Sequence, residues 1–515
     1  MSPTQVCDGE RGWSEVPEAR SWQVRWWLNR WQGASAAQRG TWRLAAVSAV
    51  TGLAVATVSV VAAGPWDSGQ RTAERARAAG ERPTGGERHS GPKPPPGAAP
   101  VLAALGDPGT VATPGSGEEA VPPPTEAGLA DAMEPLLDDA ALGDVRTVAV
   151  VDADSGRRLY GVGADRTTTP ASVIKLATGA AVLSARGGGH RLTTRAVSAG
   201  RDRVVLVGGG DPTLTARPVH GSDHPASLRE LADGTASALK RSGVRRISLG
   251  YDTSLYRGPV LHPIGPNENI SPVTPLMADE GRLDDSDHGP APRSADPAAD
   301  AARAFAGMLR DRGIGIKGEP RRAAAGHGAK ELAAVHSQPL SALVERMLTT
   351  SDNDIAEALS RQTALAAHQP ADFAGGARAV AGRLKELGLP LDGARIADGS
   401  GLDRADRVSA ALLAQVLVRA AGPDHPELRP VLTGLPVAGF TGTLRGRYAQ
   451  DAVGRGVVRA KTGTLTGVNT LAGTVVDADG RLLVFAFMTT GTTDPAGAQH
   501  ALDRMASTVA NCGCR

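Results

Sequence analysis

The first long apolar run of the chain extends from Leu44 to Gly64 and contains no charged residue. Its length is about the 20 residues that a membrane-spanning helix needs. Residues 1–43 before it are polar, and residues 65–124 after it are rich in Pro, Gly, Ala and charge, with little apolar periodicity. The pattern predicts an N-terminal tail over 1–43, a transmembrane signal anchor over 44–64 and a disordered linker over 65–124.

Two other interpretations of this apolar run are open. A buried soluble helix is disfavoured, because neither the polar tail nor the linker offers a core in which to bury it. A cleaved signal is the other interpretation, since Val61-Ala62-Ala63 resembles a small-residue cleavage site. We favour the uncleaved anchor, because the preceding segment is long and the run exceeds a usual signal core. Arginines flank the run equally on both sides, so charge does not set its orientation.

Regular apolar patterns begin near Thr125. A helical stripe over 129–137 leads into two alternating strands, 147–151 and 158–162, which are joined by the turn Asp154-Ser155-Gly156. Further strands are expected at 203–207, 246–252, 457–464, 471–476 and 482–487, and amphipathic helices at 228–239, 301–309, 340–348, from 354 onward and at 495–509. The pattern predicts an α/β (α+β) fold in which helices pack on an antiparallel sheet.

Composition separates two parts of the chain and excludes some functions. All 7 tryptophans lie within the first 66 residues, and the 56 basic and 54 acidic side chains give no indication of nucleic-acid binding. Cys7, Cys512 and Cys514 are too few for a disulfide framework. A disulfide or a metal contact in the Cys-Gly-Cys tail is open, but we expect a frayed end with free thiols. No His/Cys cluster has ligand spacing, so we expect no metal and no cofactor.

The first candidate for chemistry is the pair Ser172 and Lys175, which stands where a Thr/Pro-rich loop gives way to an Ala/Leu-rich helical pattern. A spacing of three residues puts the hydroxyl and the amine on one face of a helix. The helix N-terminus favours negative charge that develops near the serine. An amine in a dry cleft loses its proton more easily, and it can then activate the hydroxyl. The pair alone is a weak signal, because it recurs by chance in long chains.

Two further short motifs follow in a fixed order: Ser351-Asp352-Asn353 in an expected interhelical loop, and Lys461-Thr462-Gly463 on an expected strand. Together with Ser172-x-x-Lys175 they resemble the active-site set of penicilloyl-serine transferases, which comprise penicillin-binding proteins and serine β-lactamases. The interval between the first two motifs is too long for the simple helical domain of a class A β-lactamase. An insertion between these motifs is therefore implied.

That layout resembles the D-alanyl-D-alanine carboxypeptidase/endopeptidase family of class C low-molecular-mass penicillin-binding proteins, peptidase family S13. The resemblance extends to Asp398-Gly399-Ser400-Gly401-Leu402 and covers roughly residues 124–509. It implies a β-lactamase/transpeptidase-like catalytic domain formed by 125–195 and 336–511. The inserted region, 196–335, looks shorter than is usual in the family. It contains no chemical motif, and we expect it to be scaffold only.

Each motif has an expected role in this resemblance. Ser172 attacks a carbonyl, and Lys175 is the expected base. Ser351 relays a proton towards the leaving amine, and Asn353 binds a substrate amide. Lys461 adds positive potential, which helps to keep Lys175 neutral and attracts a terminal carboxylate.

The remaining expected contacts concern binding. Thr462, Gly463 and Thr464 are expected to bind the substrate, with the hydroxyls of Thr462 and Thr464 on its carboxylate. The backbone N–H groups of Ser172 and Thr464 are expected to form an oxyanion hole. The family has an arginine near the cleft, which corresponds to Arg404. A surface salt bridge is the alternative for this residue, and the preceding position is Asp403, where the family commonly has serine.

The resemblance implies a serine D,D-peptidase that cleaves D-Ala-D-Ala termini of peptidoglycan through a Ser172 acyl-enzyme and is inhibited by penicillins. Endopeptidase cleavage of cross-links is left open. Such a function requires an extracytoplasmic catalytic domain, tethered to the cell membrane by 44–64 or secreted if that segment is cleaved. The alternatives are a β-lactamase-like hydrolase, which needs a placed deacylating carboxylate, and a non-catalytic scaffold that binds stem peptides or β-lactams. The intact set of three motifs argues against the scaffold.

Overall fold

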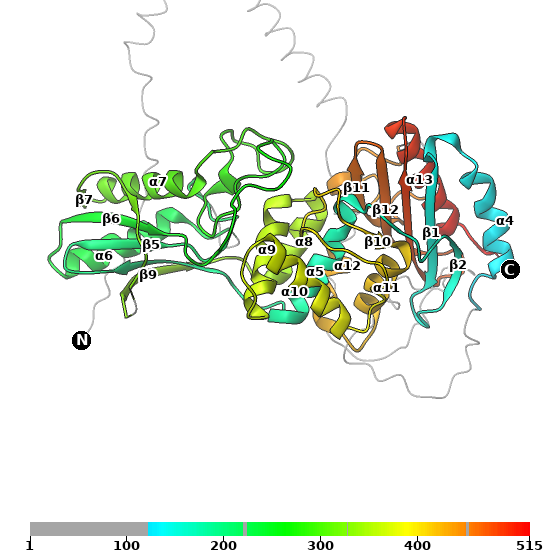
Figure 1. Cartoon of the computed structure of the whole chain (residues 1–515), viewed down its shortest axis with the longest axis horizontal. Helices are drawn as coiled ribbons and strands as arrows, with labels where there is room; N and C mark the ends of the chain where they lie inside the picture. Colours follow the sequence, from blue (N-terminus) through cyan, green and yellow to red (C-terminus); the bar gives the residue numbers. More distant parts are fainter. Residues whose placement is uncertain (1–121, 220–223, 327, 450–452, 515) are drawn as a thin grey trace, which may run out of the picture. The chain divides into compact units, whose positions relative to one another are not determined.

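The computed structural model of the chain describes residues 122–219, 224–326, 328–449 and 453–514 (Figure 1). The predicted tail, the predicted signal anchor and nearly all of the predicted linker lie outside these residues. Within the described part of the chain, no helix has the length and apolar character that crossing a membrane requires.

A five-stranded antiparallel sheet has the strand order β11-β12-β13-β1-β2. Its strands are β1 (Val145–Asp152), β2 (Arg158–Val162), β11 (Arg459–Leu465), β12 (Val468–Val476) and β13 (Leu482–Thr490). The first and last thirds of the described chain meet in the pairing of β1 with β13, where Val145 lies opposite Thr490. The five strands predicted at the two ends of this part of the chain, and the turn that joins the first two of them, are confirmed.

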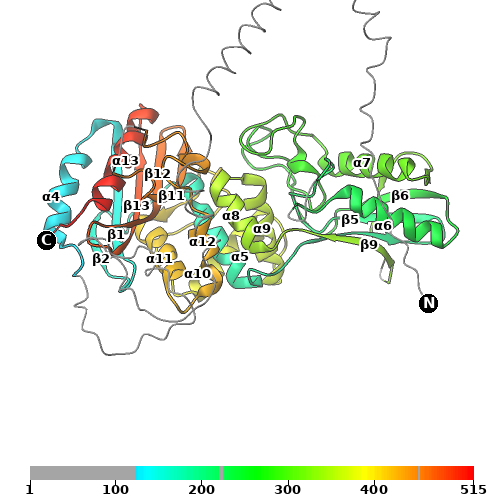
Figure 2. The same cartoon turned by 180° about the vertical axis from the view of Figure 1, so that it is seen from behind.

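Helices cover both faces of this sheet, and β13 shows why. Leu483, Phe485 and Phe487 are buried in one cluster with α4 (Glu126–Leu137) and α13 (Pro495–Ala510). The alternate residues of β13 are buried in a second cluster on the other face. That cluster includes α5 (Lys175–Arg186), α8 (Leu340–Thr350), α9 (Asn353–Ala366), α10 (Phe373–Glu386), α11 (Ala410–Ala421) and the short α12 (Pro430–Thr433), which Figure 2 shows from behind. The alternation follows from the period of two along a strand.

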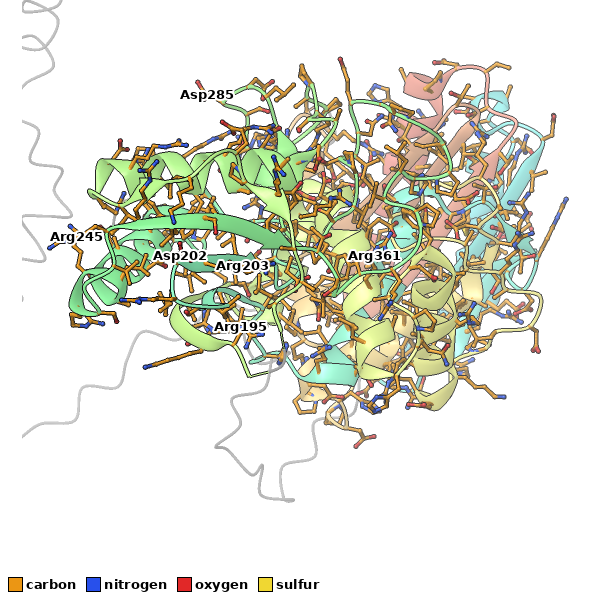
Figure 3. The ribbon with its side chains drawn as sticks, turned by 60° about the vertical axis from the view of Figure 1, so that its left-hand side comes forward. Arg195, Asp202, Arg203, Arg245, Asp285 and Arg361 are labelled. Carbon is orange, nitrogen blue, oxygen red and sulfur yellow. A yellow bond between two sulfur atoms is a disulfide. The ribbon has the colours of Figure 1, made fainter. Side chains whose placement is uncertain are left out.

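A second, mixed sheet is built from the interval between the first two motifs. It contains β4 (Thr193–Ser198), β5 (Arg203–Val207), β6 (Arg246–Asp252), β7 (Gly315–Ile316), β8 (Arg321–Arg322) and β9 (Lys330–His336). β6 pairs in parallel with β5, β7 and β8, whereas β4 pairs antiparallel with β5 and β9. Helices α6 (Leu228–Arg241) and α7 (Pro297–Asp311) share a buried cluster with one face. Arg195 and Arg203 are exposed (Figure 3), whereas the neighbouring Ala196 and Val204 belong to that cluster.

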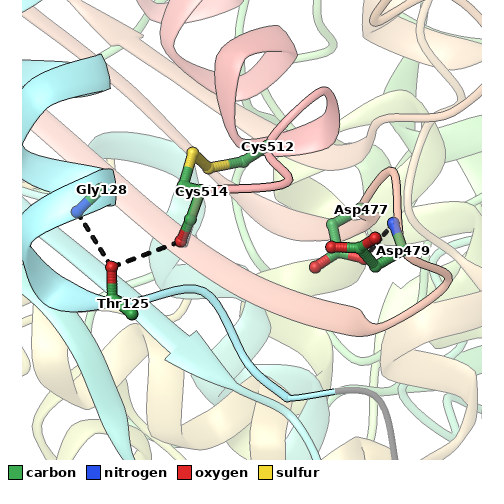
Figure 4. The surroundings of a disulfide bond; sticks show 6 residues. All are labelled: Thr125, Gly128, Asp477, Asp479, Cys512 and Cys514. Atoms are coloured by element: carbon green, nitrogen blue, oxygen red, sulfur yellow. Dashed lines mark hydrogen bonds between the residues drawn. A yellow bond between two sulfur atoms is a disulfide. The ribbon is translucent and has the colours of Figure 1, made fainter.

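The C-terminal tail is held against the start of α4 (Figure 4). Cys512 and Cys514 form a disulfide, and Cys512 is only 2% exposed. The Thr125 N–H donates to the Cys514 carbonyl at 2.8 Å, and a Cβ added at Gly128 would lie 2.8 Å from the Cys514 carbonyl carbon. The expectation of a frayed end with free thiols is therefore wrong. The cause is a contact between residues almost 400 positions apart.

Candidate active site

Ser172 lies in a tight 3₁₀ turn, η3 (Ala171–Ile174), which continues directly into α5 at Lys175. The prediction of a helix start is correct, with the difference that the serine precedes the α-helical residues. Ala171 has φ of +50°, in the left-handed region that L side chains rarely adopt. Such a residue costs on the order of 1–3 kcal/mol and persists only where its surroundings fix it. The turn leaves Ser172 partly exposed, whereas Lys175 is fully buried.

The Lys175 amine is surrounded by three oxygen atoms. Its Nζ lies 2.9 Å from the Ser172 Oγ, 2.7 Å from the Asn353 Oδ1 and 2.6 Å from the Ser400 carbonyl oxygen. A neutral amine has two N–H bonds and one lone pair. If the two carbonyl-type oxygens accept the N–H bonds, the lone pair is directed at the Ser172 hydroxyl. The geometry therefore suits proton transfer from Ser172 to Lys175.

Burial is the largest influence on the charge of Lys175, and it lowers the pKa of this amine to about 8. The opposing influences are carboxylates that raise its pKa: Asp398, Asp352, Glu357 and Asp406. The expected role of Lys461 in keeping Lys175 neutral is thus taken mainly by desolvation, which disfavours the charged form of a buried amine. The neutral form of Lys175 is therefore more accessible than that of an exposed lysine.

The second and third motifs meet through Lys461 on β11. Its Nζ donates to the Ser351 Oγ and to the Thr462 carbonyl oxygen, both at 2.8 Å. Lys461 is fully buried, and both this burial and the charge of Lys175 hold its pKa well below the usual value. Ser351 ends α8 with φ of +61°, and α9 begins two residues later at Asn353. This sharp reversal directs Ser351 to Lys461 and Asn353 to Lys175.

A pocket of about 290 Å³ joins the three motifs. The residues of the motifs that line it are Ser172, Ser351, Asp352, Asn353, Thr462 and Thr464. Thr443 also lines it, and its hydroxyl accepts a hydrogen bond from Thr462 at 2.8 Å. The site has room for a small peptide segment next to the Ser172 hydroxyl.

Gly463 allows β11 to approach Ser172 closely. A Cβ at this position would lie 2.1 Å from the Thr470 Oγ1, 2.8 Å from the Pro170 carbonyl oxygen and 3.1 Å from the Ser172 nitrogen. The first two of these contacts are too short for a real Cβ, so a side chain at 463 would force β11 or its neighbours to shift. The glycine is therefore expected to act through its lack of a side chain.

The sequence carries the signature of one family over most of its length. Residues 129–291 and 285–512 match the model of the D-Ala-D-Ala carboxypeptidase 3 (S13) family. The chain belongs to peptidase family S13. It is 37% identical over 437 residues to carboxypeptidase DacB of Mycolicibacterium smegmatis, a match that covers 82% of this chain and 90% of that protein. It is 36% identical over 411 residues to carboxypeptidase Rv3627c of Mycobacterium tuberculosis, covering 76% and 85% of the two chains.

A solved structure supports the fold of this S13 chain. Penicillin-binding protein 4 (dacB) of Haemophilus influenzae superposes with a TM-score of 0.60 at 21% identity. The match covers 73% of this chain and 98% of that protein. The mixed α/β architecture is therefore that of a penicillin-binding protein, and the family is one of serine-type hydrolases.

In this S13 chain, the region between the first two motifs contributes to the pocket, so the expectation of scaffold only is wrong. Asn269, Arg282 and Arg293 line the pocket together with the motif residues. The Asn353 Nδ2 donates to the Asn269 carbonyl oxygen at 2.9 Å. Arg293 forms a buried ion pair with Asp354 at 3.0 Å, next to Asn353 in sequence. These contacts join residues far apart in the chain, which a local pattern does not reveal.

Arg404 is separate from this pocket. Its guanidinium donates to the Thr466 carbonyl oxygen, in the turn between β11 and β12. Arg404 is not among the residues that line the pocket, and its partner is a backbone oxygen instead of a carboxylate. The side chain thus contacts the end of the strand that carries Lys461, and its predicted contact with the substrate stays a prediction.

Ser400 is the main site residue that sequence reasoning missed. Its segment entered the sequence analysis only as part of the family resemblance, with no role for Ser400, although the Ser400 carbonyl makes the shortest of the three contacts of Lys175. The loop is also held by Thr178, whose hydroxyl donates to the Gly399 carbonyl at 2.7 Å. The run of glycines around Ser400 was the available signal, because close backbone approach requires residues without a side chain. Gly401 fits this reason, since its Cβ would lie 2.1 Å from the Ala171 carbonyl oxygen.

Proposed function

We propose that this chain is a serine D,D-peptidase that hydrolyses D-Ala-D-Ala termini of peptidoglycan stem peptides through an acyl-enzyme. The observation that carries the proposal is the position of the Lys175 amine, 2.9 Å from the Ser172 hydroxyl and directed by two further oxygens. A buried lysine with a pKa of about 8 is a suitable base for a serine nucleophile.

The acylation step follows from this geometry. The Ser172 Oγ attacks the carbonyl carbon before the terminal residue, and its proton passes to the Lys175 Nζ. The backbone N–H groups of Ser172 and Thr464 are the proposed donors to the oxyanion. Ser351, hydrogen-bonded to Lys461, relays a proton to the departing amine, and D-alanine leaves. Water then hydrolyses the ester, and the Ser172 hydroxyl is regenerated.

In the proposed binding mode, the carboxylate end of the substrate lies against β11, where Thr462 and Thr464 line the pocket and the buried Lys461 lies in the same strand. Lys461 attracts the terminal carboxylate of the substrate, which the hydroxyls of Thr462 and Thr464 also bind. Asn353 binds an amide of the peptide backbone. The proposal is consistent with the relatives, which are named carboxypeptidases, and with penicillin-binding protein 4 of Haemophilus influenzae, which has been solved in complex with a β-lactam. We therefore expect β-lactams to acylate Ser172.

The location of the protein is part of the proposal. Because stem peptides lie outside the cytoplasm, the domain formed by 125–195 and 336–511, with 196–335 inserted, is proposed to act there. The uncharged run 44–64 is the proposed anchor, and 65–124 the spacer. Membrane fractionation of the full chain and of a chain lacking 44–64 tests this location. Release of the full chain by high salt would contradict a spanning anchor.

The test of function is labelling of the full-length protein with a fluorescent penicillin, beside the variant Ser172→Ala. We expect a slowly decaying adduct that the variant lacks, and release of D-alanine from a synthetic stem peptide by the wild type only. Rapid hydrolysis of the antibiotic without a lasting adduct would favour a β-lactamase-like hydrolase. Folded protein with neither labelling nor hydrolysis would leave a binding scaffold.

A further inference from the structure

A buried group of titratable side chains lies beneath Lys175. His262, Glu357 and Asp398 have side-chain atoms within 4.8 Å of one another, although they come from three separate segments. Their exposed fractions are 3%, 1% and 1%. Charged or polar groups this deep need hydrogen-bonded partners, because desolvation is otherwise too costly. Several of these partners are backbone N–H groups of the loop whose Ser400 carbonyl contacts Lys175.

Asp398 binds the backbone of its own loop and His262. Its Oδ2 accepts from the His262 Nε2 at 2.9 Å and from the Asp403 N–H at 2.7 Å. Its Oδ1 accepts from the Gly401 N–H at 2.6 Å and from the Ser400 N–H at 3.0 Å. The Asp398 carboxylate thus holds three backbone N–H groups of the loop, and His262 is the ionisable side chain that can balance its negative charge.

Glu357, on α9, binds the same loop from a second direction. Its Oε1 accepts from the N–H groups of Gly399 and Ser400, both at 2.9 Å. The N–H side of this loop therefore faces two buried carboxylates, and its Ser400 carbonyl faces the Lys175 amine at 2.6 Å. A displacement of about 1 Å at such a contact can cost a factor of about 10² in rate.

We propose that His262 and Glu357 are positioning residues for Lys175, because they hold the loop whose carbonyl orients its amine. The proposal rests on the proposed function, since it concerns the acylation of Ser172. Neither side chain is in the pocket that receives the substrate. His262 comes from the inserted region, which would thereby act on the reaction through the loop as well as through the pocket wall.

The charged side chains around His262 and Glu357 determine in which direction a mutation of either residue should shift the pKa of Lys175. Burial opposes the charge of His262, but the hydrogen bond that His262 donates to Asp398 and the nearby carboxylates raise its pKa overall. The charged groups that face it are Glu357, Asp398 and Asp403. Burial and Asp398 raise the pKa of Glu357 to about 7, while His262 and Arg361 lower it. The Arg361 guanidinium lies over the Phe373 ring, with its central carbon 4.5 Å from the ring centroid.

Loss of the positive charge of His262 leaves Asp398 to act on Lys175 without compensation. The pKa of Lys175 should then rise, and the acid limb of the acylation profile should move to higher pH. Loss of the negative charge of Glu357 removes a group that raises the pKa of Lys175. The acid limb should then move to lower pH. The two positioning residues are thus expected to shift the same limb in opposite directions.

The experiment measures the second-order rate of penicillin acylation of the full chain against pH for wild type, His262→Ala, His262→Gln and Glu357→Gln. We expect His262→Ala to lose about 10- to 100-fold in rate and to shift the acid limb to higher pH. His262→Gln retains a donor for Asp398 and should recover part of the rate. Glu357→Gln retains the acceptor for the loop, and should shift the limb to lower pH by roughly 0.5–1 unit.

The matched control is Asp503→Asn, which removes the charge of buried Asp503 from its ion pair with the half-buried Arg447 (2.7 Å), away from the pocket. This variant should lose stability but retain the wild-type pH profile. The proposal is overturned if folded His262→Ala keeps the wild-type rate and limb, or if Glu357→Gln leaves the limb unchanged or shifts it upward. Should His262→Ala fail to fold, the Glu357→Gln profile decides alone. Absence of labelling in wild type would instead overturn the proposed function.

Discussion

The two lysines of the active site are equally buried, but their surroundings differ in charge. Lys175 lies among carboxylates that raise its pKa against the effect of burial, and the result is about 8. For Lys461, burial and the charge of Lys175 both lower the pKa. Among the described residues, Lys461 has a hydroxyl and a carbonyl as its hydrogen-bond partners and no carboxylate in an ion pair.

Under the proposed function, this difference would let one residue type serve two purposes in one site. A base must lose and regain its proton near working pH, which the carboxylates around Lys175 allow. A residue that binds an anion is best left without a counter-charge in the free enzyme. A substrate carboxylate would supply the counter-charge that Lys461 lacks and would raise its pKa. Under the proposed function, binding of the substrate carboxylate would therefore favour the charged form of Lys461.

The largest effect is expected from removal of the Lys175 amine. Lys175→Met removes the base and should lower the acylation rate of Ser172 by about 10³-fold, within the usual range for general-base catalysis. Stopped-flow labelling with a fluorescent penicillin measures it, and circular dichroism controls for folding. A variant that acylates within tenfold of wild type would exclude Lys175 as the base.

A smaller effect is expected from removal of the Lys461 amine. Lys461→Met should lower kcat/KM for a stem peptide with a free terminal carboxylate by about 10- to 100-fold, as expected for loss of a charged hydrogen bond. The same peptide with a terminal amide should lose distinctly less, because it offers no negative charge to Lys461. Mass spectrometry of the released residue compares both substrates. Equal losses would show that Lys461 acts on the chemical step alone.

The pH dependence sharpens the comparison without a mutation. Because the neutral form of Lys175 is the proposed base, the acylation rate should rise with pH and approach a plateau above a midpoint near pH 8. Well below the midpoint the rate should fall about tenfold per pH unit, as the neutral fraction does. The acylation rate of Ser172, measured from pH 5 to 10 with a probe that carries no charge, tests this prediction. A limb centred near pH 6, or a flat profile, would contradict the pKa of Lys175.

The sequence predicted those parts of the site that depend on short spacings. Ser172 and Lys175 are three residues apart, so one helical turn brings them together, and the pattern of β11 places Lys461 on a strand. The order of the three motifs identified the family and with it the juxtaposition of distant segments. Strands and helices with clear periodicity were found at nearly the observed bounds.

The remaining parts of the site depend on contacts between segments without a local signal. His262 and Asp398 are 136 positions apart, and Asn269 and Asn353 are 84 apart. No periodicity in the region of His262 indicates which loop it will support. The charge of Lys175 was likewise attributed to Lys461, because burial and the carboxylates around the amine become visible only when the chain is folded.

The smallest expected effect lies far from both lysines, at the C-terminal tail. Cys512→Ser opens a disulfide that spans a single glycine, and a short loop confers little entropic stabilisation. The free energy of unfolding should fall by about 1 kcal/mol or less, with unchanged acylation. Gly128→Ala should cost more, about 1–3 kcal/mol, because its Cβ would meet the Cys514 backbone at 2.8 Å. Thermal denaturation ranks the two variants, and the reverse order would mean that the disulfide, not the backbone contact with α4, holds the tail.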